Sequence, residues 1–383
     1  MSDRDIELYL HIPFCIRKCA YCDFLSFSGE RKTQEAYSNA LIREIQAVGN
    51  REYSVSSIYI GGGTPSILQE DSMVAILDAI RNNFKVLSWA EISIECNPGT
   101  VTAQKLHAYH QAGMNRISFG LQSAHNHELE KLGRIHTWEM FLESYQLARK
   151  EGFSNINVDI MSGLPGQTRE EYLDTLRKVI RLNPEHVSAY SLILEEGTPF
   201  YQMYYNTELN HELPDEEEER RMYWHGRKFL EEQGFSCYEI SNYARHSKEC
   251  RHNLGYWTGK EYLGIGLGAS SYFNGKRFYN TDSMKEYLQM SAKPDRIRIE
   301  EEIVTKKRAM EEVAFLGLRL TKGIDMEDFE RRFECRFQDV YGDVMKRFLS
   351  MGFLAINGQY LYLTEKGIDV SNQIMAEFLL DGE

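Results

Sequence analysis

The residues best suited to chemistry in this sequence are three cysteines in one short loop. Cys15, Cys19 and Cys22 have C-x3-C-x2-C spacing and follow an alternating, β-rich run, so the thiols lie on a loop that leaves a strand. Three thiolates on such a loop can bind three irons of a 4Fe-4S cluster and leave the fourth iron without a protein ligand. Clusters that only transfer electrons normally have four cysteine ligands, so the spacing predicts an iron that is open to another ligand.

Zinc and disulfides are the alternatives for these thiols. A structural zinc site needs a fourth ligand, which His11 could supply, but such sites usually have a second pair of ligands downstream, and this sequence has none. Disulfides are disfavoured because the seven cysteines are an odd number, are widely scattered outside the loop, and follow no signal peptide. The cluster is therefore the favoured interpretation, with zinc as the main alternative.

An open cluster iron can be chelated by the amine and carboxylate of S-adenosylmethionine. The chemistry that this implies is reductive cleavage of the sulfonium to a 5′-deoxyadenosyl radical. The sequence also resembles a known family here, because Tyr9-x-His11-x-Pro13 followed by C-x3-C-x2-C is the pattern of radical S-adenosylmethionine enzymes, in the coproporphyrinogen oxidase-like branch. The resemblance extends over nearly the whole chain.

Strands and helices alternate along the part of the chain that must position these residues. Strands are expected at Ile6–Ile12, Val55–Ile60, Glu91–Cys96, Arg116–Phe119, Asn155–Ile160 and Val187–Leu192, with helices between them. Six β/α units in series predict a parallel sheet. We therefore expect an α/β fold, a partial (β/α)6 radical SAM barrel, with an open nucleotide-binding type of sheet as the alternative.

Polar residues and glycines follow the ends of these strands. Gly61-Gly62-Gly63-Thr64-Pro65 follows the second strand, Glu95 ends the third, Gln122 follows the fourth and Asp159 closes the fifth. The C-terminal ends of parallel barrel strands meet on one face, so these residues should line one pocket. A turn rich in glycine lets the backbone approach a ligand closely.

Two carboxylates among apolar strand residues, Glu95 and Asp159, each need a partner. A structural ion pair with Arg134 is one possibility; the favoured one is ligand binding, with carboxylates on ribose hydroxyls and an amine and Arg134 on the methionine carboxylate. The family resemblance implies contacts with S-adenosylmethionine at Tyr9, Gly62, Gly63, Thr64, Glu95, Gln122, Arg134 and Asp159, and places Tyr21 near the adenine.

A second motif, His252-Asn253-Leu254-Gly255-Tyr256-Trp257, follows Cys250-Arg251. A lone histidine beside aromatic residues is most often a satisfied core residue. However, HNLGYW resembles the HN-x-x-YW segment of the heme chaperone group in this branch. An imidazole is a common axial ligand of heme iron and aromatic rings pack on porphyrins, so heme contacts are expected at His252, Tyr256 and Trp257, with Cys250 as an alternative ligand.

The chain has 383 residues, enough for a large and a small domain. We expect a radical SAM core barrel at 1–236, a connecting segment with the HNLGYW motif at 237–295, and a small C-terminal helical, winged-helix-like domain at 296–383 whose hairpin centres on Asn357-Gly358. Winged helices often bind DNA, but this last region has 13 Lys and Arg against 17 Asp and Glu, and the whole chain has a net charge of −13. A lid or docking role is therefore favoured, and no nucleic acid partner is expected.

The resemblance implies two functions from different classes. One is an oxygen-independent coproporphyrinogen III oxidase, which decarboxylates its substrate to protoporphyrinogen IX; the other is a heme chaperone that transfers heme to acceptor proteins. Phe24 stands where the oxidases have another cysteine, and only eight residues precede Tyr9 where they have an N-terminal arm. Both departures favour the chaperone. A radical methyltransferase of heme catabolism is a more distant third.

The chaperone interpretation carries further expectations. Its cofactors are a 4Fe-4S cluster, S-adenosylmethionine and heme, and its partners are heme-accepting proteins, with membrane-associated respiratory enzymes as candidates, and an electron donor for the cluster. The sequence has no apolar run near the ~20 residues that a membrane span needs, so the expected location is the cytoplasm. Whether the protein is also an enzyme is left open at this point.

Overall fold

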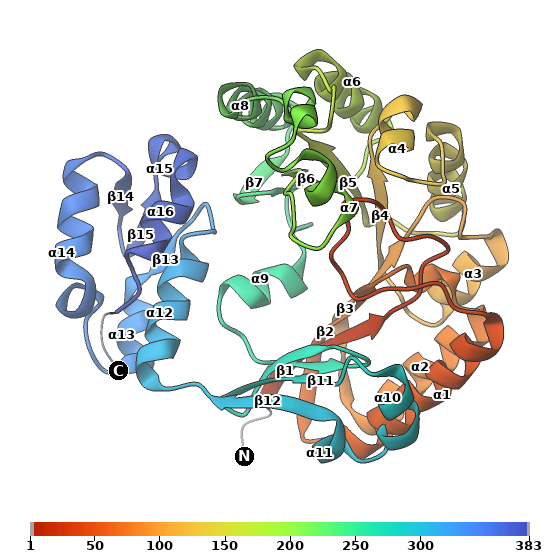
Figure 1. Ribbon diagram of the computed structural model, residues 1–383. Helices are drawn as coiled ribbons and strands as arrows, with labels where there is room; N and C mark the ends of the chain where they lie inside the picture. Colours follow the sequence, from red (N-terminus) through yellow and green to blue (C-terminus); the bar gives the residue numbers. More distant parts are fainter. Residues whose placement is uncertain (1–3, 381–383) are drawn as a thin grey trace.

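Six parallel strands form the centre of the fold, as the sequence predicts. The computed structural model describes residues 4–380, and the strands pair in chain order as β1 (Arg4–Ile12), β2 (Tyr53–Gly62), β3 (Lys85–Cys96), β4 (Arg116–Gln122), β5 (Ile156–Ser162) and β6 (His186–Ser191). The helices that connect them are α1 (Arg31–Val48), α2 (Glu70–Asn83), α3 (Ala103–Gln111), α4 (Asn126–Lys131), α5 (Trp138–Lys150) and α6 (Arg169–Ile180), and they cover the outside of the strands (Figure 1). The expected α/β fold and partial barrel are confirmed.

The barrel stays open because both of its edge strands have other neighbours. β9 (Tyr262–Ile265) pairs parallel with β1, and β8 (Asn242–Ala244) pairs antiparallel with β6. With β7 (Ser236–Glu239), β10 (Ser270–Phe273), β11 (Lys276–Asn280) and β12 (Arg298–Ile303), the sheet reaches twelve strands. The expected connecting segment, 237–295, thus contributes strands to the main sheet, and β12 continues this sheet past residue 296.

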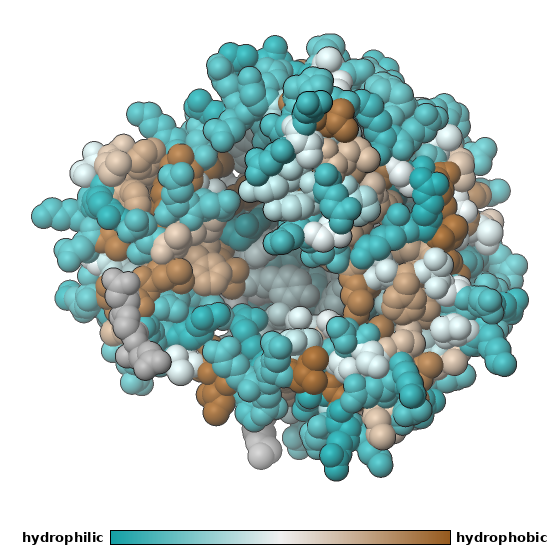
Figure 2. Space-filling model, viewed as in Figure 1, coloured by the Kyte–Doolittle hydropathy of each residue, from teal (hydrophilic) through white to brown (hydrophobic). Residues whose placement is uncertain are grey.

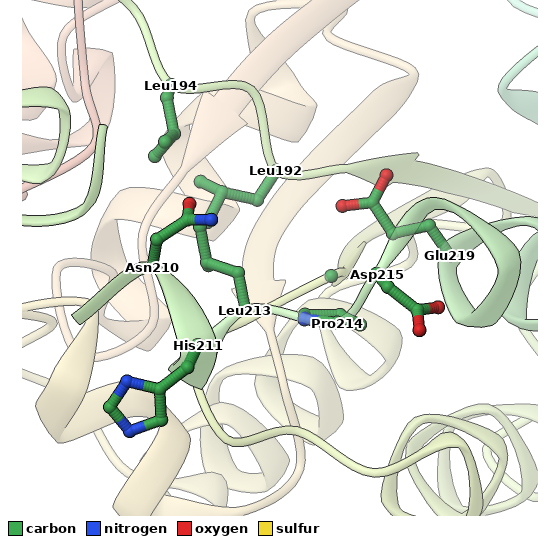
Figure 3. A pocket seen from close by; sticks show the side chains of 9 residues that line it. Leu192, Leu194, Asn210, His211, Leu213, Pro214, Asp215 and Glu219 are labelled. Atoms are coloured by element: carbon green, nitrogen blue, oxygen red, sulfur yellow. The ribbon is translucent and has the colours of Figure 1, made fainter. Parts of the chain in front are cut away.

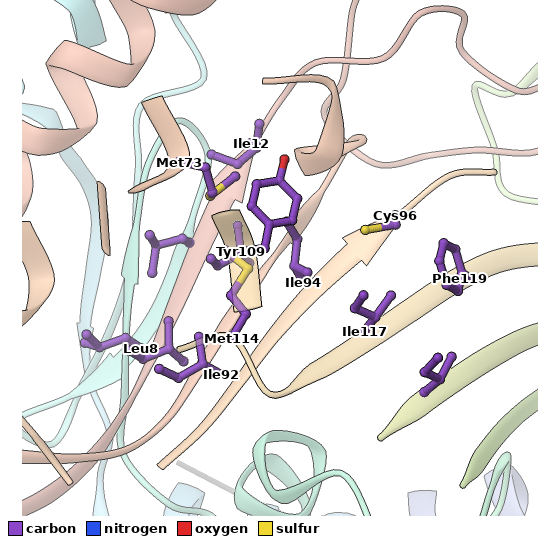
Figure 4. Close-up of a cluster of buried hydrophobic side chains, with 14 of the residues drawn as sticks. Leu8, Ile12, Met73, Ile92, Ile94, Cys96, Tyr109, Met114, Ile117 and Phe119 are labelled. Carbon is purple, nitrogen blue, oxygen red and sulfur yellow. The ribbon is translucent and has the colours of Figure 1, made fainter. Parts of the chain in front are cut away.

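Side chains of each central strand alternate between two chemically different faces. Leu8 and Ile94 have no exposed surface and pack in one cluster with Met73 of α2 and Tyr109 of α3 (Figure 4). Complete burial of one such aliphatic side chain stabilises a fold by roughly 1.5–3 kcal/mol. The intervening residues, such as Tyr59, Glu95 and Asp159, point to the inside of the partial barrel and bring polar groups to it.

The HNLGYW motif forms α9 (Arg251–Trp257), which packs against β2 and against the C-terminal domain (Figure 1). Gly255 allows this close approach, because a Cβ at that position would overlap the carboxylate of Glu7 on β1. The helix formed by this motif thus connects the barrel strands with the C-terminal domain.

The C-terminal domain has its own hydrophobic core. It contains α12 (Lys306–Gly317), α13 (Met326–Phe333), α14 (Phe337–Ser350) and a three-stranded sheet of β13 (Ile324–Asp325), β15 (Tyr360–Leu363) and β14 (Leu354–Asn357), followed by α15 (Glu365–Asp369) and α16 (Ser371–Ala376). Leu320 forms an isolated antiparallel β-bridge with Glu239 of β7 and so joins this domain to the main sheet.

Among residues 4–380, we find no helix with the length and hydropathy that crossing a bilayer requires.

Candidate cluster and cofactor site

A cavity of about 520 Å³ lies at the C-terminal ends of the six parallel strands. It brings together the three cysteines Cys15, Cys19 and Cys22 with eight of the nine predicted cofactor contacts, namely Tyr21, Gly62, Gly63, Thr64, Glu95, Gln122, Arg134 and Asp159. Tyr9 is the ninth; its ring stacks on Tyr59, a wall residue, with 6.5 Å between ring centroids. The space-filling view shows that this side of the molecule is deeply hollowed at its centre (Figure 2).

The cysteine loop presents its three thiols to this cavity. The Cys22 backbone N–H bonds to the Cys19 carbonyl at 3.2 Å, which forms a tight turn, and the Cys15 sulfur lies 3.4 Å from the Thr64 hydroxyl. Burial raises the pKa of the Cys22 thiol, so a metal is needed to keep it ionised. Each of the seven cysteines is free.

The donor set fits an iron–sulfur cluster better than zinc. His11, the candidate fourth zinc ligand, has both ring nitrogens bonded, Nδ1 to the Tyr9 hydroxyl at 3.0 Å and Nε2 to the Leu25 carbonyl at 2.9 Å. Three soft thiolates, with no fourth metal-binding residue grouped with them in the described part of the chain, match a cluster with one open iron.

Two hydrogen bonds orient the Glu95 carboxylate in the cavity, where it can bind a positively charged group. Its carboxylate accepts hydrogen bonds from the Tyr59 hydroxyl at 2.9 Å and from the Gly62 N–H at 3.1 Å. Burial and the negative charge of Asp159 raise the pKa of Glu95 to about 7. An ammonium group in the cavity would favour its ionised form, so the site suits the amine of S-adenosylmethionine. Gly62 has a φ of 109°, which favours glycine at this turn.

Asp159 is held on the adjacent wall by two neutral donors. The Asn157 amide donates to it at 2.7 Å and the Ser118 hydroxyl at 3.2 Å. Burial raises the pKa of Asp159, so a further hydrogen bond from a ligand hydroxyl would stabilise the carboxylate. A ribose supplies such donors.

Arg134 lies beside the cluster loop and is oriented by three contacts. Its Nη2 donates to Asn97 and to the Gly120 carbonyl, both at 2.6 Å, and its Nη1 donates to the Cys19 sulfur at 3.5 Å. Within residues 4–380 it forms no ion pair with Glu95 or Asp159, which contradicts the structural alternative, and its buried Nε has no partner. A buried guanidinium with an unpartnered N–H fits a ligand carboxylate.

The sequence analysis missed several wall residues, among them Tyr59, Ser118 and Tyr190. Tyr190 donates from its hydroxyl to the Gln122 amide oxygen at 2.9 Å and so orients it. Tyr59, Ser118 and Tyr190 stand at alternate, inward positions of predicted strands, so the two-residue period of the strands was the signal that could have found them.

The structure places the predicted heme residues behind the cavity wall, where the His252 ring stacks on Tyr59 with 5.2 Å between ring centroids. His252 is 1% exposed, and its ring nitrogens bond to the Ser57 hydroxyl at 2.7 Å and the Tyr256 hydroxyl at 2.9 Å. Burial, with help from Arg116, lowers the pKa of His252 to about 3, so the ring is neutral. The Trp257 ring lies under the Arg319 guanidinium. Heme contacts at His252, Tyr256 and Trp257 stay a prediction.

The alternative ligand Cys250 is also fully buried, and burial raises the pKa of its thiol to about 12. A thiol with this pKa is protonated at neutral pH and is a poor metal ligand in its present surroundings.

The open barrel, its three-cysteine loop and the cavity beside that loop define a radical SAM protein. A model of the radical SAM superfamily matches residues 9–179, and a model of the HemN C-terminal domain matches residues 304–370. The chain belongs to the HemW family of radical SAM proteins. It is 37% identical to the heme chaperone HemW of Lactococcus lactis, over 100% of this chain and 99% of that protein, and 36% identical to heme chaperone HemW of Bacillus subtilis, over 97% and 98%.

A solved structure confirms the fold. Coproporphyrinogen III oxidase (HemN) from Escherichia coli, a radical SAM enzyme, has a TM-score of 0.85 and covers 98% of this chain and 90% of its own chain. Its sequence identity to this chain is 24%, so the likeness concerns the architecture alone.

Proposed function

We propose that this protein is a heme chaperone that binds heme and transfers it to acceptor proteins. The observation that carries the proposal is the full-length identity to heme chaperones named HemW. Phe24 supports it, because this side chain is 70% exposed at the cavity where the oxidases of this branch have a cysteine. An exposed aromatic ring cannot take part in the reactions of a thiol. It can, however, make an apolar contact with a ligand or a partner.

The cavity would hold a 4Fe-4S cluster on Cys15, Cys19 and Cys22, with exchangeable S-adenosylmethionine beside it. When bound, the cluster supplies an electron and an open iron site. Arg134 is pre-positioned by Asn97 and Gly120 to bind the methionine carboxylate. Glu95 binds the amine in the same cavity.

The rest of the cofactor lies along the neighbouring strand ends. Asp159 accepts hydrogen bonds from the ribose, and Tyr21 lies beside the adenine, on the cysteine loop. Thr64 and Gln122 complete the wall, and Tyr9 supports it by stacking on Tyr59.

An electron donor for the cluster docks on the cysteine loop. Arg17 and Lys18 are exposed beside the cavity, and in the part of the chain that the structure describes neither has an ion pair or hydrogen bond. The chain as a whole carries a net charge of −13 and Asp23 lies on the same loop, but Arg17 and Lys18 are adjacent and place two positive charges next to the cluster site. Adjacent positive charges of this kind can steer an acidic redox protein to the loop.

The acceptors are heme-dependent proteins, with membrane-associated respiratory enzymes as the first candidates. Free thiols at all seven cysteines suit a reducing compartment, so the protein works in the cytoplasm.

Two assays on the anaerobically reconstituted protein test the proposal. Titration with hemin should give a saturable Soret band, while incubation with coproporphyrinogen, reductant and S-adenosylmethionine should release no carbon dioxide. A protein that converts coproporphyrinogen and does not bind hemin would be an oxidase instead.

A further inference from the structure

A histidine and two glutamates meet where α4 packs beside the start of α6, and we propose that they bind a divalent transition-metal ion, with Zn²⁺ as the expected occupant. The residues are His127 and Glu128 of α4 and Glu171 of α6. They belong to the segments that follow β4 and β5, and none of the three lines the cofactor cavity. The proposal does not depend on the heme-chaperone function.

The three side chains are close enough to share one ion. A ring nitrogen of His127 and one carboxylate oxygen from each glutamate all lie within 4.8 Å of one another. Nε2 of His127 is 3.4 Å from Oε1 of Glu171, close to the ~3.4 Å that separates two ligands of a tetrahedral ion with bonds of about 2.0–2.1 Å. The His127 side chain is 58% exposed, so its ring can turn to complete the coordination.

Glu128 distinguishes this group from an ordinary surface ion pair, because its carboxylate is buried and only half satisfied. The side chain is 1% exposed, and its Oε2 accepts a hydrogen bond from the Gln167 amide at 3.0 Å. Its Oε1 is also buried and has no hydrogen-bond partner within residues 4–380. A buried carboxylate oxygen without a donor is costly, and a cation bound to it would offset that cost.

Glu171 has one oxygen for the fold and one for the ion. Its Oε2 accepts hydrogen bonds from the backbone N–H of Thr168 at 2.9 Å and from the Thr168 hydroxyl at 2.7 Å, and so caps the start of α6. These bonds hold the carboxylate in place, with Oε1 next to the His127 ring. A ligand oriented in this way needs little further ordering when the ion binds.

One imidazole nitrogen and two carboxylate oxygens suit a first-row transition metal. Imidazole is a common ligand of Zn²⁺ and Fe²⁺, and Zn²⁺ also accepts carboxylate oxygens. A zinc ion with three protein ligands keeps a fourth position for water. The exposed His127 ring leaves that position open to solvent.

Another group of acids with a histidine does not converge in this way. A pocket of about 490 Å³ follows the end of β6, and Asp215 and Glu219 lie on one side of it. The His211 ring lies on the opposite side and points away from both carboxylates (Figure 3). This pocket therefore has acids and an imidazole without a shared point for an ion.

An ion bound to α4 and α6 would fix the segment that supports the cofactor site. The Leu132 carbonyl, at the end of α4, accepts a hydrogen bond from the Ala20 N–H of the cysteine loop at 3.2 Å. The Arg134 N–H donates to the Leu129 carbonyl of the same helix at 2.9 Å. Because the ion binds the folded chain, it stabilises this arrangement.

Metal analysis of the full-length, cluster-loaded protein tests the site. The protein is freed of excess iron, equilibrated with Zn²⁺ over a range of concentrations, and assayed for both metals. The wild type should bind about one zinc per chain and keep its cluster iron. His127→Ala and Glu128→Gln should each lower zinc affinity by at least about tenfold, the low end of what loss of an outer-shell partner of a metal ligand costs.

His107→Ala is the matched control. His107 is a similarly exposed histidine that pairs with Glu151 at 3.2 Å, and no third ligand is grouped with this pair in the described part of the chain. This variant should bind zinc as the wild type does. Zn²⁺ should also raise the melting temperature of the wild type and of His107→Ala, but not that of His127→Ala.

Replacing the exposed His127 should leave the fold intact, which an unchanged cluster absorbance would show. Equal zinc affinity in the wild type and in His127→Ala would overturn the site, and so would a wild type that binds zinc no better than His107→Ala and His127→Ala alike. Hemin plays no part in these measurements, so their outcome is separate from that of the chaperone proposal.

Discussion

Replacing Glu95 by glutamine should stabilise the ligand-free protein and weaken S-adenosylmethionine binding at the same time. The physical reason is that the ionised Glu95 carboxylate is buried, and the positive group that would compensate its charge belongs to the ligand, which the free protein lacks. Its pKa is about 7 instead of 4.5, so the unfolded chain ionises from pH 4.5 upward while the folded protein keeps this proton until about pH 7. The folded state binds more protons in this window, and stability is lost as the pH rises through it.

The magnitude follows from the size of the pKa change. Each pKa unit corresponds to about 1.4 kcal/mol, so the ionised carboxylate destabilises the ligand-free fold by about 3 kcal/mol above pH 7. Glutamine has a similar shape, keeps an acceptor for one of the two donors, and lets the Tyr59 hydroxyl turn to accept from its amide. Binding loses one charged contact, worth roughly 1.5–3 kcal/mol or about 10- to 100-fold in affinity.

Thermal unfolding and calorimetry measure the two effects. At pH 8 without ligand, Glu95→Gln should melt at a higher temperature than the wild type, and near pH 4.5 the difference should vanish. Saturating S-adenosylmethionine should reverse the order at pH 8. Glu130→Gln, at an exposed helix position, is the control and should change neither quantity. A variant that is less stable than the wild type at pH 8, or that binds the ligand equally well, refutes the role given to Glu95.

Three other substitutions test separate parts of the structure. Arg134→Lys removes the planar fork and should weaken S-adenosylmethionine binding about 10- to 100-fold by calorimetry with the cluster retained; unchanged affinity would return Arg134 to a structural role. Gly255→Ala should destabilise the fold by at least about 1 kcal/mol in urea unfolding, because its Cβ would overlap the Glu7 carboxylate; equal stability would mean that α9 can shift. Lys18→Glu should slow reduction of the cluster by an acidic donor in stopped-flow experiments at low salt, with cluster content unchanged; an equal rate places the docking site elsewhere.

The sequence was sufficient to predict which strand-end residues lie together in the cavity, because they follow a simple rule. Residues at the ends of successive parallel strands meet, so Glu95, Gln122 and Asp159 can be grouped from the strand pattern alone. Sequence patterns did not reveal which oxygen or nitrogen each would contact. The unpartnered Nε of Arg134, for example, depends on the positions of Asn97 and Gly120, which are set by tertiary packing.

The surroundings of the HNLGYW motif could not be predicted from the sequence. His252 has the residue type of a heme ligand, but it is buried against Ser57 of β2, 195 residues away in sequence, and Glu7 of β1, which is farther still. The edge strands β8 to β12 were also missed, because they are short and have little alternation.

Heme transfer is the most direct measurement of the proposed chaperone function. The cluster-loaded protein is first saturated with heme, freed of excess heme, and mixed with an apo form of a b-type cytochrome. Difference spectra should show the Soret band of the protein decaying as that of the cytochrome grows, at a rate that depends on acceptor concentration. A rate equal to that of spontaneous heme release, independent of the acceptor, would contradict the function proposed for this protein.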